Sequence, residues 1–557
     1  MNHTATTPIR SARGPAACRP LALVTTLVIS AASLTTWPWG APLHANPTLP
    51  AVFGDHMVLQ RDQPVPVWGS AQRNEPVTVR FGDQEHRTTA DASGSWRVTL
   101  DPMEASSEPR DLQVEGHSLL LLRDVLVGEV WLASGQSNMQ WSVAQSADPE
   151  TEIANGDHPR LRMLNVMRET AREPQDDLRG HWLVCHPETV AGFSAVGYYF
   201  ARHLQGELDV PVGILHTSWG GTRVEAWTSE PTLRSTAAAA AILEAWDVRR
   251  LTWQQGGLQR RMSAIERQRG WENNSAGTLF GNIERRREGA GVQQVPGAPG
   301  AEADPSLSNH HYSNLYHQMI HPLVGYAMRG AIWYQGESNA SRAVQYRELM
   351  PALIGDWRQL WAVEFPFIQV QLAGFRPQGG AQAAEQWLEL QEAQLLTALN
   401  TPNTGMAVAH DIGDPADIHP GNKQEVGRRL ALWALHHTYG REDVVPSGPV
   451  LSAHEVTERG MELTFDHADG LRTLADDQPV TGFELAGEDQ VWHVAEAVIE
   501  DHRVIVSAEA VETPVAVRYA WDSYPERVNL VNGAGLPASS FRTDDWARIT
   551  RDRVTPD

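Results

Sequence analysis

Three short segments of this 557-residue chain combine glycine with hydroxyl or amide side chains, each after an apolar run. The first is Gly135-Gln136-Ser137-Asn138. Glycine permits a tight turn that lifts a serine out of a sheet, and N–H groups at the start of a following helix would face a developing oxyanion. Ser137 is therefore a candidate nucleophile, although a serine that only caps a helix fits the same loop. Met139 occupies the place of the second glycine in a G-x-S-x-G elbow, which disfavours an ordinary α/β-hydrolase.

The second and third segments offer further hydrogen-bond donors. In residues 218–222, Gly220 and Gly221 allow the backbone to approach a ligand closely and to present an N–H group, although paired glycines also form ordinary turns. In residues 335–339, the side-chain amides of Gln335 and Asn339 are candidate donors to an oxyanion. An asparagine at this place can equally cap the next helix.

A base for a serine nucleophile occurs late in the chain, at His419. A histidine takes a serine proton near neutral pH, and a carboxylate on its other ring nitrogen fixes the tautomer and stabilises the imidazolium. Asp411, Asp414 and Asp417 lie upstream. These acidic groups could instead bind a cation, but one histidine with scattered aspartates lacks a metal-ligand spacing.

Short buried strands precede all four segments and alternate with helix-period stretches, which is typical of an α/β layer with a mainly parallel sheet. Ligands bind beyond the carboxyl ends of the strands in such sheets, so we expect the four loops to share one site. The predicted strands are 125–132, 212–216, 330–334, 367–372 and 406–410. Apolar stripes predict helices from Val196 to Leu208, with Ser194 as N-cap, from Leu349 to Trp361, and from Val426.

The regions before and after the α/β layer have a different spacing of apolar residues. Residues 46–122 alternate with period two, as in 77–81 and 96–100, and predict a small N-terminal β-domain. Alternation returns in a C-terminal β-domain, 444–557, at 461–465, 504–506 and 515–519. Between them we expect an α/β domain, 123–443, with a helical insertion at about 232–305 that ends in a loop around 296–300.

The first 45 residues predict a secretory signal. Arg10, Arg13 and Arg19 precede an apolar stretch at 21–34, and small residues permit cleavage after Ala45. A membrane anchor is the alternative, but the stretch is shorter than the roughly 20 residues that span a bilayer. We therefore expect an exported protein, periplasmic or extracellular, with no membrane span after cleavage.

Charge and cysteine content narrow the function further. A formal net charge of −23 argues against a nucleic-acid partner, which requires concentrated positive charge. Cleavage of the signal would remove Cys18 and leave Cys185 alone, so the sequence predicts no intramolecular disulfide, cysteine nucleophile or cysteine-rich metal site. The oligomeric state cannot be predicted.

Together these segments resemble the SGNH hydrolases, and within them the sialate O-acetylesterase family of carbohydrate esterases. The matching stretches are 128–141, 216–227, 329–340 and 411–431, and the match extends from the N-terminal β-domain through 532–546. The resemblance implies a flavodoxin-like three-layer α/β/α domain with Ser137 as nucleophile and His419 as base. It also implies an oxyanion hole formed by the Ser137 N–H, a glycine N–H from Gly220 or Gly221, and a side-chain amide of the third segment.

This sequence departs from the wider SGNH pattern at two positions. The pattern has an aspartate three residues before the histidine, but Ala416 stands there; we expect Asp417 to complete the triad, with Asp414 as the competitor. In the third segment the wider pattern has an asparagine two residues after the glycine, and this chain has Ser338 at that position. For this reason Gln335 ranks above Asn339 as the amide donor.

The resemblance implies removal of O-acetyl groups from sugars, either sialic acid or a plant glycan such as xylan, without a metal or organic cofactor. We expect Gln136, Trp219 and Glu337 to contact the substrate. Trp141 is a further candidate for sugar contact, and loop packing explains either tryptophan equally well. Two alternatives remain. One is a non-catalytic carbohydrate-binding protein, and the other is a glycoside hydrolase that acts through Glu337 and an aspartate.

Overall fold

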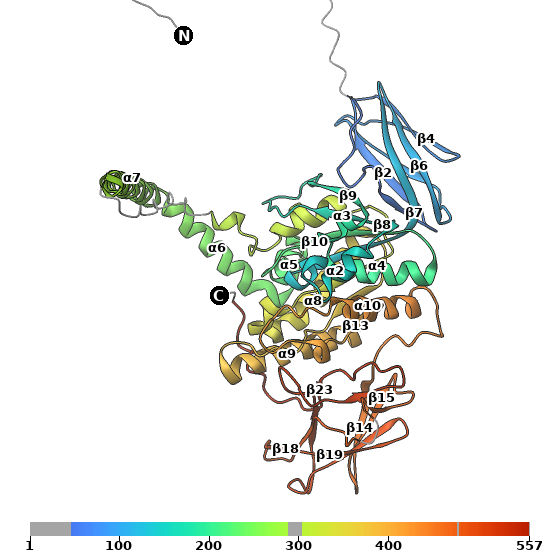
Figure 1. The fold of residues 1–557 in the computed structure, drawn as a ribbon, viewed down its shortest axis with the longest axis vertical. Coiled ribbons are helices and arrows are strands. Elements are labelled where there is room, and N and C mark those ends of the chain that lie inside the picture. The colour runs from blue at the N-terminus through green and yellow to red at the C-terminus, as the bar shows by residue number, and fades with distance from the viewer. Residues whose placement is uncertain (1–45, 288–303, 476–477, 556–557) are drawn as a thin grey trace, which may run out of the picture. The chain divides into compact units, whose positions relative to one another are not determined.

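Strand β7 (Leu119–Gly135) runs through two sheets of the computed structural model, which describes residues 46–287, 304–475 and 478–555 (Figure 1). Its first part pairs antiparallel with β6 (Ser106–Glu115), and its second part pairs parallel with β10 (Val212–Ser218) and β11 (Gly330–Tyr334). Residues 125–135 are all buried, as expected for a strand with neighbours on both sides. The strand crosses the predicted domain boundary at 122–123 without a break.

The central sheet has the order β13-β12-β11-β7-β10-β8-β9. All of its pairings are parallel except that of β9 (Gly180–Cys185) with β8 (His158–Val166). The remaining strands are β12 (Phe367–Val370) and β13 (Thr404–Ala407). The five strands predicted from the sequence are confirmed, with ends that differ by a few residues. Because β7, β10, β11 and β13 are parallel, the loops that follow them meet at one edge of the sheet.

Strands β8 and β9 were not predicted. Strand β8 begins with His158, Pro159 and Arg160, whose polar or ring-constrained side chains hide the apolar pattern that follows. The burial patterns of β8 and β9 do not alternate regularly, and their pairing is irregular between His158 and Arg162.

Helices pack in pairs against this sheet. α4 (Ala195–Leu208) contacts α10 (Lys423–His437), β8 and β10, while α10 also contacts β12 and β13. α8 (Ala343–Trp361) packs on α9 (Gly380–Asn400), which contacts the same two strands. The predicted cap is confirmed, because the Ser194 hydroxyl accepts a hydrogen bond from the Gly197 N–H at 3.2 Å. Shorter helices are α1 (Ser137–Gln140), α2 (Pro149–Ala154) and α3 (Pro187–Val190).

The predicted helical insertion contains α5 (Glu230–Ser235), α6 (Ala240–Gln255) and α7 (Gly257–Arg287). Ile242, Leu243 and Trp246 of α6 are buried and join the main core. The predicted loop at 296–300 lies outside the described residues.

Antiparallel strands form the two flanking regions. In β5 (Ser95–Leu100), Trp96, Val98 and Leu100 are buried and alternate with exposed residues, as the sequence predicts. The other N-terminal strands are β1 (Val58–Gln60), β2 (Val65–Ser70), β3 (Pro76–Phe81) and β4 (Gln84–Thr89). The C-terminal strands are β14 (Val450–Thr457), β15 (Gly460–Asp466), β16 (Arg472–Thr473), β17 (Phe483–Ala486), β18 (Trp492–Val494), β19 (Glu496–Glu500), β20 (Arg503–Ser507), β21 (Ala516–Tyr519), β22 (Leu530–Val531) and β23 (Phe541–Arg542).

The C-terminal strands share a core with the central sheet. Leu395 of α9 and Met406 of β13 pack in the same apolar cluster as Phe465 and Phe541. Residues 45–557 accordingly form one unit, and the domain limits inside it stay predictions. No helix in the described ranges is both long and apolar enough to cross a membrane.

Candidate active site

Ser137 is the first residue of α1, directly after the buried strand β7. The turn before it requires glycine: Gly135 has φ +140°, and a Cβ there would lie 2.2 Å from the Tyr334 carbonyl oxygen. The Gln136 N–H donates to that same oxygen at 2.9 Å. This close approach fixes the turn to β11 and leaves Ser137 half-buried, between the buried residues Gln136 and Asn138.

His419 lies in the loop between β13 and α10. Its Nδ1 is 3.4 Å from Asp417 Oδ1, and the same oxygen accepts a hydrogen bond from the backbone N–H of His419 at 2.8 Å. Burial lowers the pKa of His419 below its ordinary value, and Asp417 only partly opposes this shift. The imidazole is therefore neutral at pH 7, as a base must be.

The other two predicted aspartates have different partners. Asp414 accepts hydrogen bonds from the Ala416 and Asp417 N–H groups and so shapes the turn. Asp411 forms a two-oxygen ion pair with Arg429 of α10. Asp417 is thus the aspartate that contacts His419. Within the described part of the chain, no group of three or more His, Cys, Asp or Glu side chains is arranged to hold a metal ion.

One asparagine joins the serine loop to the histidine loop. Asn138, next to Ser137, donates to the carbonyl of Ile418, next to His419, at 3.0 Å. Among the described residues, no hydrogen bond yet joins the Ser137 hydroxyl to the His419 ring. Such contacts commonly close only when substrate is bound.

Trp141 orients His419 in a way that was not predicted. Its indole lies 4.6 Å from the His419 ring with an interplanar angle of 8°, and its N–H donates to the Gln145 carbonyl at 2.7 Å. The sequence suggested substrate contact or loop packing for a tryptophan at this place. The stacked ring instead limits how far the base can rotate.

Gly220 is packed directly against Ser137. A Cβ at Gly220 would lie 3.2 Å from Ser137 Cβ, so a side chain there would crowd the serine. Its N–H donates to Gln140 Oε1 at 2.8 Å. Gly221 has φ +74° and open space where a Cβ would stand.

Gln335 and Asn339 belong to a fully buried network behind the loops. The Gln335 amide nitrogen donates to Asn339 Oδ1 at 2.7 Å and to the Thr222 carbonyl at 3.2 Å. The Asn339 amide nitrogen donates to Glu225 Oε2 at 3.0 Å. Glu225 in turn pairs with the buried Arg342. Both amides therefore have partners within the protein in this structure.

The residues that the sequence predicts to contact substrate differ in how deeply they are buried. Gln136 is buried, and its Oε1 accepts weak hydrogen bonds from the Gly336 and Ser338 N–H groups. Trp219 is half-buried against the main core. The carboxyl group of Glu337 accepts from Asn138 Nδ2 at 2.6 Å, and its second oxygen is buried.

A second histidine near the serine loop is unsuited to act as base. His216, in β10, bonds Asn165 Oδ1 at 2.9 Å through Nδ1 and Ser218 Oγ at 2.7 Å through Nε2. Burial lowers the pKa of His216 to about 4. Its ring nitrogens are committed to holding the second loop, whereas His419 is partly exposed.

Lys423 was missed by sequence reasoning. It is the first residue of α10, is fully buried, and donates to Asn138 Oδ1 at 2.5 Å. A signal was present, because Lys423 is the only lysine among the 45 lysine and arginine residues of the chain.

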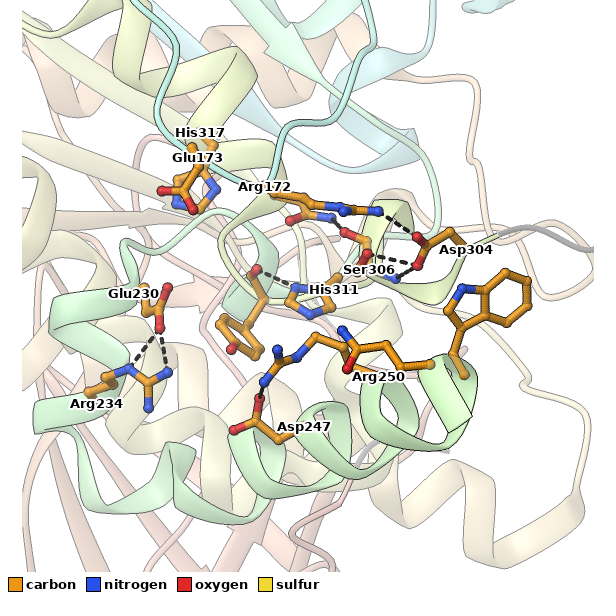
Figure 2. A pocket seen from close by; sticks show the side chains of 14 residues that line it. Arg172, Glu173, Glu230, Arg234, Asp247, Arg250, Asp304, Ser306, His311 and His317 are labelled. Atoms are coloured by element: carbon orange, nitrogen blue, oxygen red, sulfur yellow. Dashed lines mark hydrogen bonds and ion pairs between the residues drawn. The ribbon is translucent and has the colours of Figure 1, made fainter. Parts of the chain in front are cut away.

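Figure 2 shows a pocket lined by side chains of α5, α6 and residues 172–173 and 304–317. Its volume is about 570 Å³, and none of the predicted site residues lines it. Its three arginines each face a carboxylate, in the pairs Arg172–Asp304, Arg234–Glu230 and Arg250–Asp247.

The chain also matches known proteins over most of its length. A family model described as "Carbohydrate esterase, sialic acid-specific acetylesterase" matches residues 127–276 and 260–436, more than half of the chain. Sialate O-acetylesterase of Rattus norvegicus is 29% identical over 510 residues, which cover 85% of this chain and 89% of the rat protein. The Homo sapiens enzyme is 27% identical over 513 residues, covering 85% and 87%. The crystal structure of a carbohydrate acetylesterase from Xanthomonas citri aligns with TM-score 0.74 and 38% identity, covering 90% of this chain and all of that one.

Proposed function

The chain belongs to the sialic acid-specific acetylesterase family of carbohydrate esterases, and from this premise we propose that Ser137, His419 and Asp417 hydrolyse O-acetyl esters of sugars. Its enzyme class is that of a carboxylic ester hydrolase, which sets aside the non-catalytic and glycoside-hydrolase alternatives. The observation that carries the residue assignment is the His419–Asp417 contact in a loop that Asn138 ties to Ser137.

In the first half of the reaction His419 Nε2 takes the Ser137 hydroxyl proton while Ser137 Oγ bonds the acetyl carbon. The tetrahedral oxyanion collapses, the bond to the sugar oxygen breaks, and that oxygen receives the proton from His419. In the second half His419 removes a proton from water, which attacks the acetyl-serine. Acetate leaves, and Ser137 regains its proton. Asp417 holds Nδ1 protonated throughout.

We assign the oxyanion hole to the N–H groups of Ser137 and Gly220, with Gly221 as the alternative. The support is the contact of Gly220 with Ser137 and the side-chain character of its present acceptor, Gln140, which can withdraw when a carbonyl enters. Gln335 and Asn339 would support the oxyanion hole indirectly, because their hydrogen bonds fix the second and third loops to each other.

Strand order and helix packing support a flavodoxin-like three-layer α/β/α arrangement of the SGNH type. The α4–α10 pair and the α8–α9 pair would form the outer layers. The N-terminal segment supports export. Recovery of a mature chain that starts at Asn46 outside the cytoplasm would test this, and a full-length cytoplasmic chain would contradict it.

We propose an O-acetylated sialic acid as the preferred substrate, because the curated relatives are sialate O-acetylesterases. Acetate release from O-acetylated sialic acid and from acetylated xylan should be measured with wild-type and Ser137→Ala protein. Preference for the sialic acid, abolished by the substitution, is expected. Preference for xylan would overturn the assignment of sialic acid as substrate. Near-wild-type turnover of Ser137→Ala would overturn the assignment of Ser137 as nucleophile.

Trp219 offers a test of sugar contact. If its half-buried ring stacks on the sugar, Trp219→Ala should raise KM for sugar acetates and leave turnover of p-nitrophenyl acetate unchanged. Equal losses on both substrates would assign Trp219 to loop packing.

A further inference from the structure

Lys423 is conspicuous because the chain uses arginine at every other basic position. Arginine and lysine are not equivalent when buried: the guanidinium is planar, broad and permanently charged, whereas the ammonium is a compact charge that can lose its proton. Lys423 is 0% exposed and lies at the start of α10, four residues after His419. A position that retains lysine in an otherwise arginine-only chain points to a role that arginine cannot fill.

Asn138 is the partner of this lysine, and its amide links three segments. Its oxygen accepts from Lys423 Nζ at 2.5 Å, and its nitrogen donates to Glu337 Oε1 at 2.6 Å and to the Ile418 carbonyl at 3.0 Å. Asn138 directly follows Ser137 in the chain, and Ile418 directly precedes His419. A shift of Asn138 would therefore move the Ser137 N–H and the His419 loop together.

Glu337 and Lys423 form an incomplete pair, in which Lys423 is fully buried and Glu337 is half-buried. They face each other through the Asn138 amide, and Glu337 Oε2 has no hydrogen-bond partner among the residues that the structure describes. Lys423 Nζ lies 5.3 Å from the centroid of the Tyr334 ring, whose hydroxyl also has no partner within the described ranges. Two unpartnered polar groups in one buried cluster are costly, so the cluster is poorly explained as a device for stability alone.

We propose that Lys423 and Glu337 are positioning residues that act through Asn138 to hold the Ser137 turn against the His419 loop. This inference rests on the proposed function, in which Ser137 attacks and His419 is the base. The protonated ammonium strengthens the hydrogen bond to Asn138 Oδ1, and Glu337 orients the amide from its opposite end.

This arrangement makes the site sensitive to pH. Four charged or titratable groups face Lys423. They are Tyr334 of β11, Glu337 at the start of the 3₁₀ turn η7 (Glu337–Arg342), and Asp417 and His419 in the loop before α10. Burial lowers the pKa of Lys423 to about 7, while Glu337 and Asp417 act to raise it. Above that pH the ammonium is lost, so kcat should fall on the alkaline side.

The single lysine permits a direct titration. Protein labelled with ¹⁵N-lysine and carrying no lysine in its tag gives one side-chain signal, which reports Lys423 alone. We expect a midpoint near 7 in the wild type and a lower midpoint in Glu337→Gln, because that substitution removes a charge that raises the pKa of Lys423. The alkaline limb of kcat should shift by the same amount. A Lys423 signal that titrates near 10.5 would overturn the pH dependence, and an alkaline limb that does not follow the Lys423 midpoint in Glu337→Gln would overturn the positioning role.

Kinetics of Lys423→Met supply the second test, with Arg428→Met as the matched control on the same helix. Arg428 forms two hydrogen bonds with Glu425, one turn earlier on the same helix. We expect kcat of Lys423→Met to fall about 10-fold to 100-fold with KM little changed, as for a misplaced catalytic group, while Arg428→Met retains wild-type kcat. The acidic limb should also move to higher pH, because the Lys423 charge no longer lowers the pKa of His419.

Wild-type kcat and an unchanged pH profile in Lys423→Met would overturn the positioning role. That outcome is distinct from failure of the proposed function, which Ser137→Ala reports separately. If Lys423→Met fails to fold, the Lys423 titration in Glu337→Gln and its agreement with the alkaline limb still decide the matter.

Discussion

Two glutamates lie behind the loops that carry the proposed active site, and each faces a buried cation, but Glu225 is fully buried whereas Glu337 is half-buried. Glu225 contacts Arg342 directly and accepts from Asn339, so both of its oxygens are bonded. Glu337 meets Lys423 only through Asn138 and keeps one buried oxygen without a partner in the described structure. The first cluster fixes the second loop to the third, and the second lies beside the nucleophile.

The two clusters also shift pKa values in opposite directions. Burial raises the pKa of Glu225, but Arg342 and Asn339 outweigh it and hold the pKa below its ordinary value. Burial dominates at Glu337 and raises its pKa, despite Asn138 and Lys423. A complete ion pair stabilises the fold, whereas an incomplete one leaves groups that change charge within the working pH range.

The largest difference between the two clusters is expected when Arg342 or Lys423 is replaced by an uncharged residue. Arg342→Met leaves Glu225 charged and buried without its partner, so the free energy of unfolding should fall by about 3–5 kcal/mol. Denaturant unfolding at pH 7 measures this. A loss below about 1 kcal/mol would show that the Glu225–Arg342 pair is not a structural brace.

Lys423→Met should have the opposite effect on stability. The folded pKa of about 7 lies below the ordinary 10.5, so between these values the unfolded chain binds more protons and stability rises with pH. The cost of the buried charge is fully present below pH 7. At pH 6 the variant should therefore be more stable than wild type, with the gain fading toward pH 10. Destabilisation at pH 6 would make Lys423 a structural residue.

Glu337 and Glu225 should differ in a smaller way when each is changed to glutamine. The raised pKa of Glu337 means that the folded chain binds more protons above pH 4.5, so wild-type stability falls as pH rises through the folded pKa. Glu337→Gln should then gain about 1 kcal/mol at neutral pH, whereas Glu225→Gln should lose stability there. Denaturant midpoints at pH 5 and pH 8 distinguish the two, and equal effects at both sites would remove the contrast.

The smallest effect is expected from the aromatic support of His419. Trp141→Ala removes the ring stacked on the imidazole and should lower kcat about threefold to tenfold, since such contacts are worth roughly 0.5–1.5 kcal/mol. The acidic limb of the pH–rate profile should also move to higher pH. The imidazole becomes more solvated, which weakens the burial that lowers the pKa of His419. An unchanged kcat on sugar acetates would leave Trp141 as loop packing.

Much of this arrangement could be predicted from the sequence, because local rules govern it. Buried apolar runs located five strands of the sheet, and the loops after them contain Ser137, Gly220 and the His419–Asp417 pair. Strands β8 and β9 escaped because polar residues and an irregular pairing obscure their pattern.

Long-range partners could not be predicted in the same way. The hydrogen bonds of Gln335 and Asn339 run to Thr222 and Glu225, more than 100 residues away, so the sequence suggested exposed donors where the structure has buried ones. Lys423 was hidden for the same reason, since 285 residues separate it from Asn138. Only its uniqueness in the chain could have drawn attention to it.

The most direct test of the central claim is to find the acetyl group on the enzyme. Wild-type protein mixed with an O-acetylated sugar and quenched in acid during turnover should carry an acetyl ester on the peptide that contains Ser137, detected by mass spectrometry. The mechanism predicts acetylation at Ser137, and none in Ser137→Ala. Acetylation at another residue, or turnover with no acetyl-enzyme in a protein whose Ser137→Ala variant remains active, would contradict it.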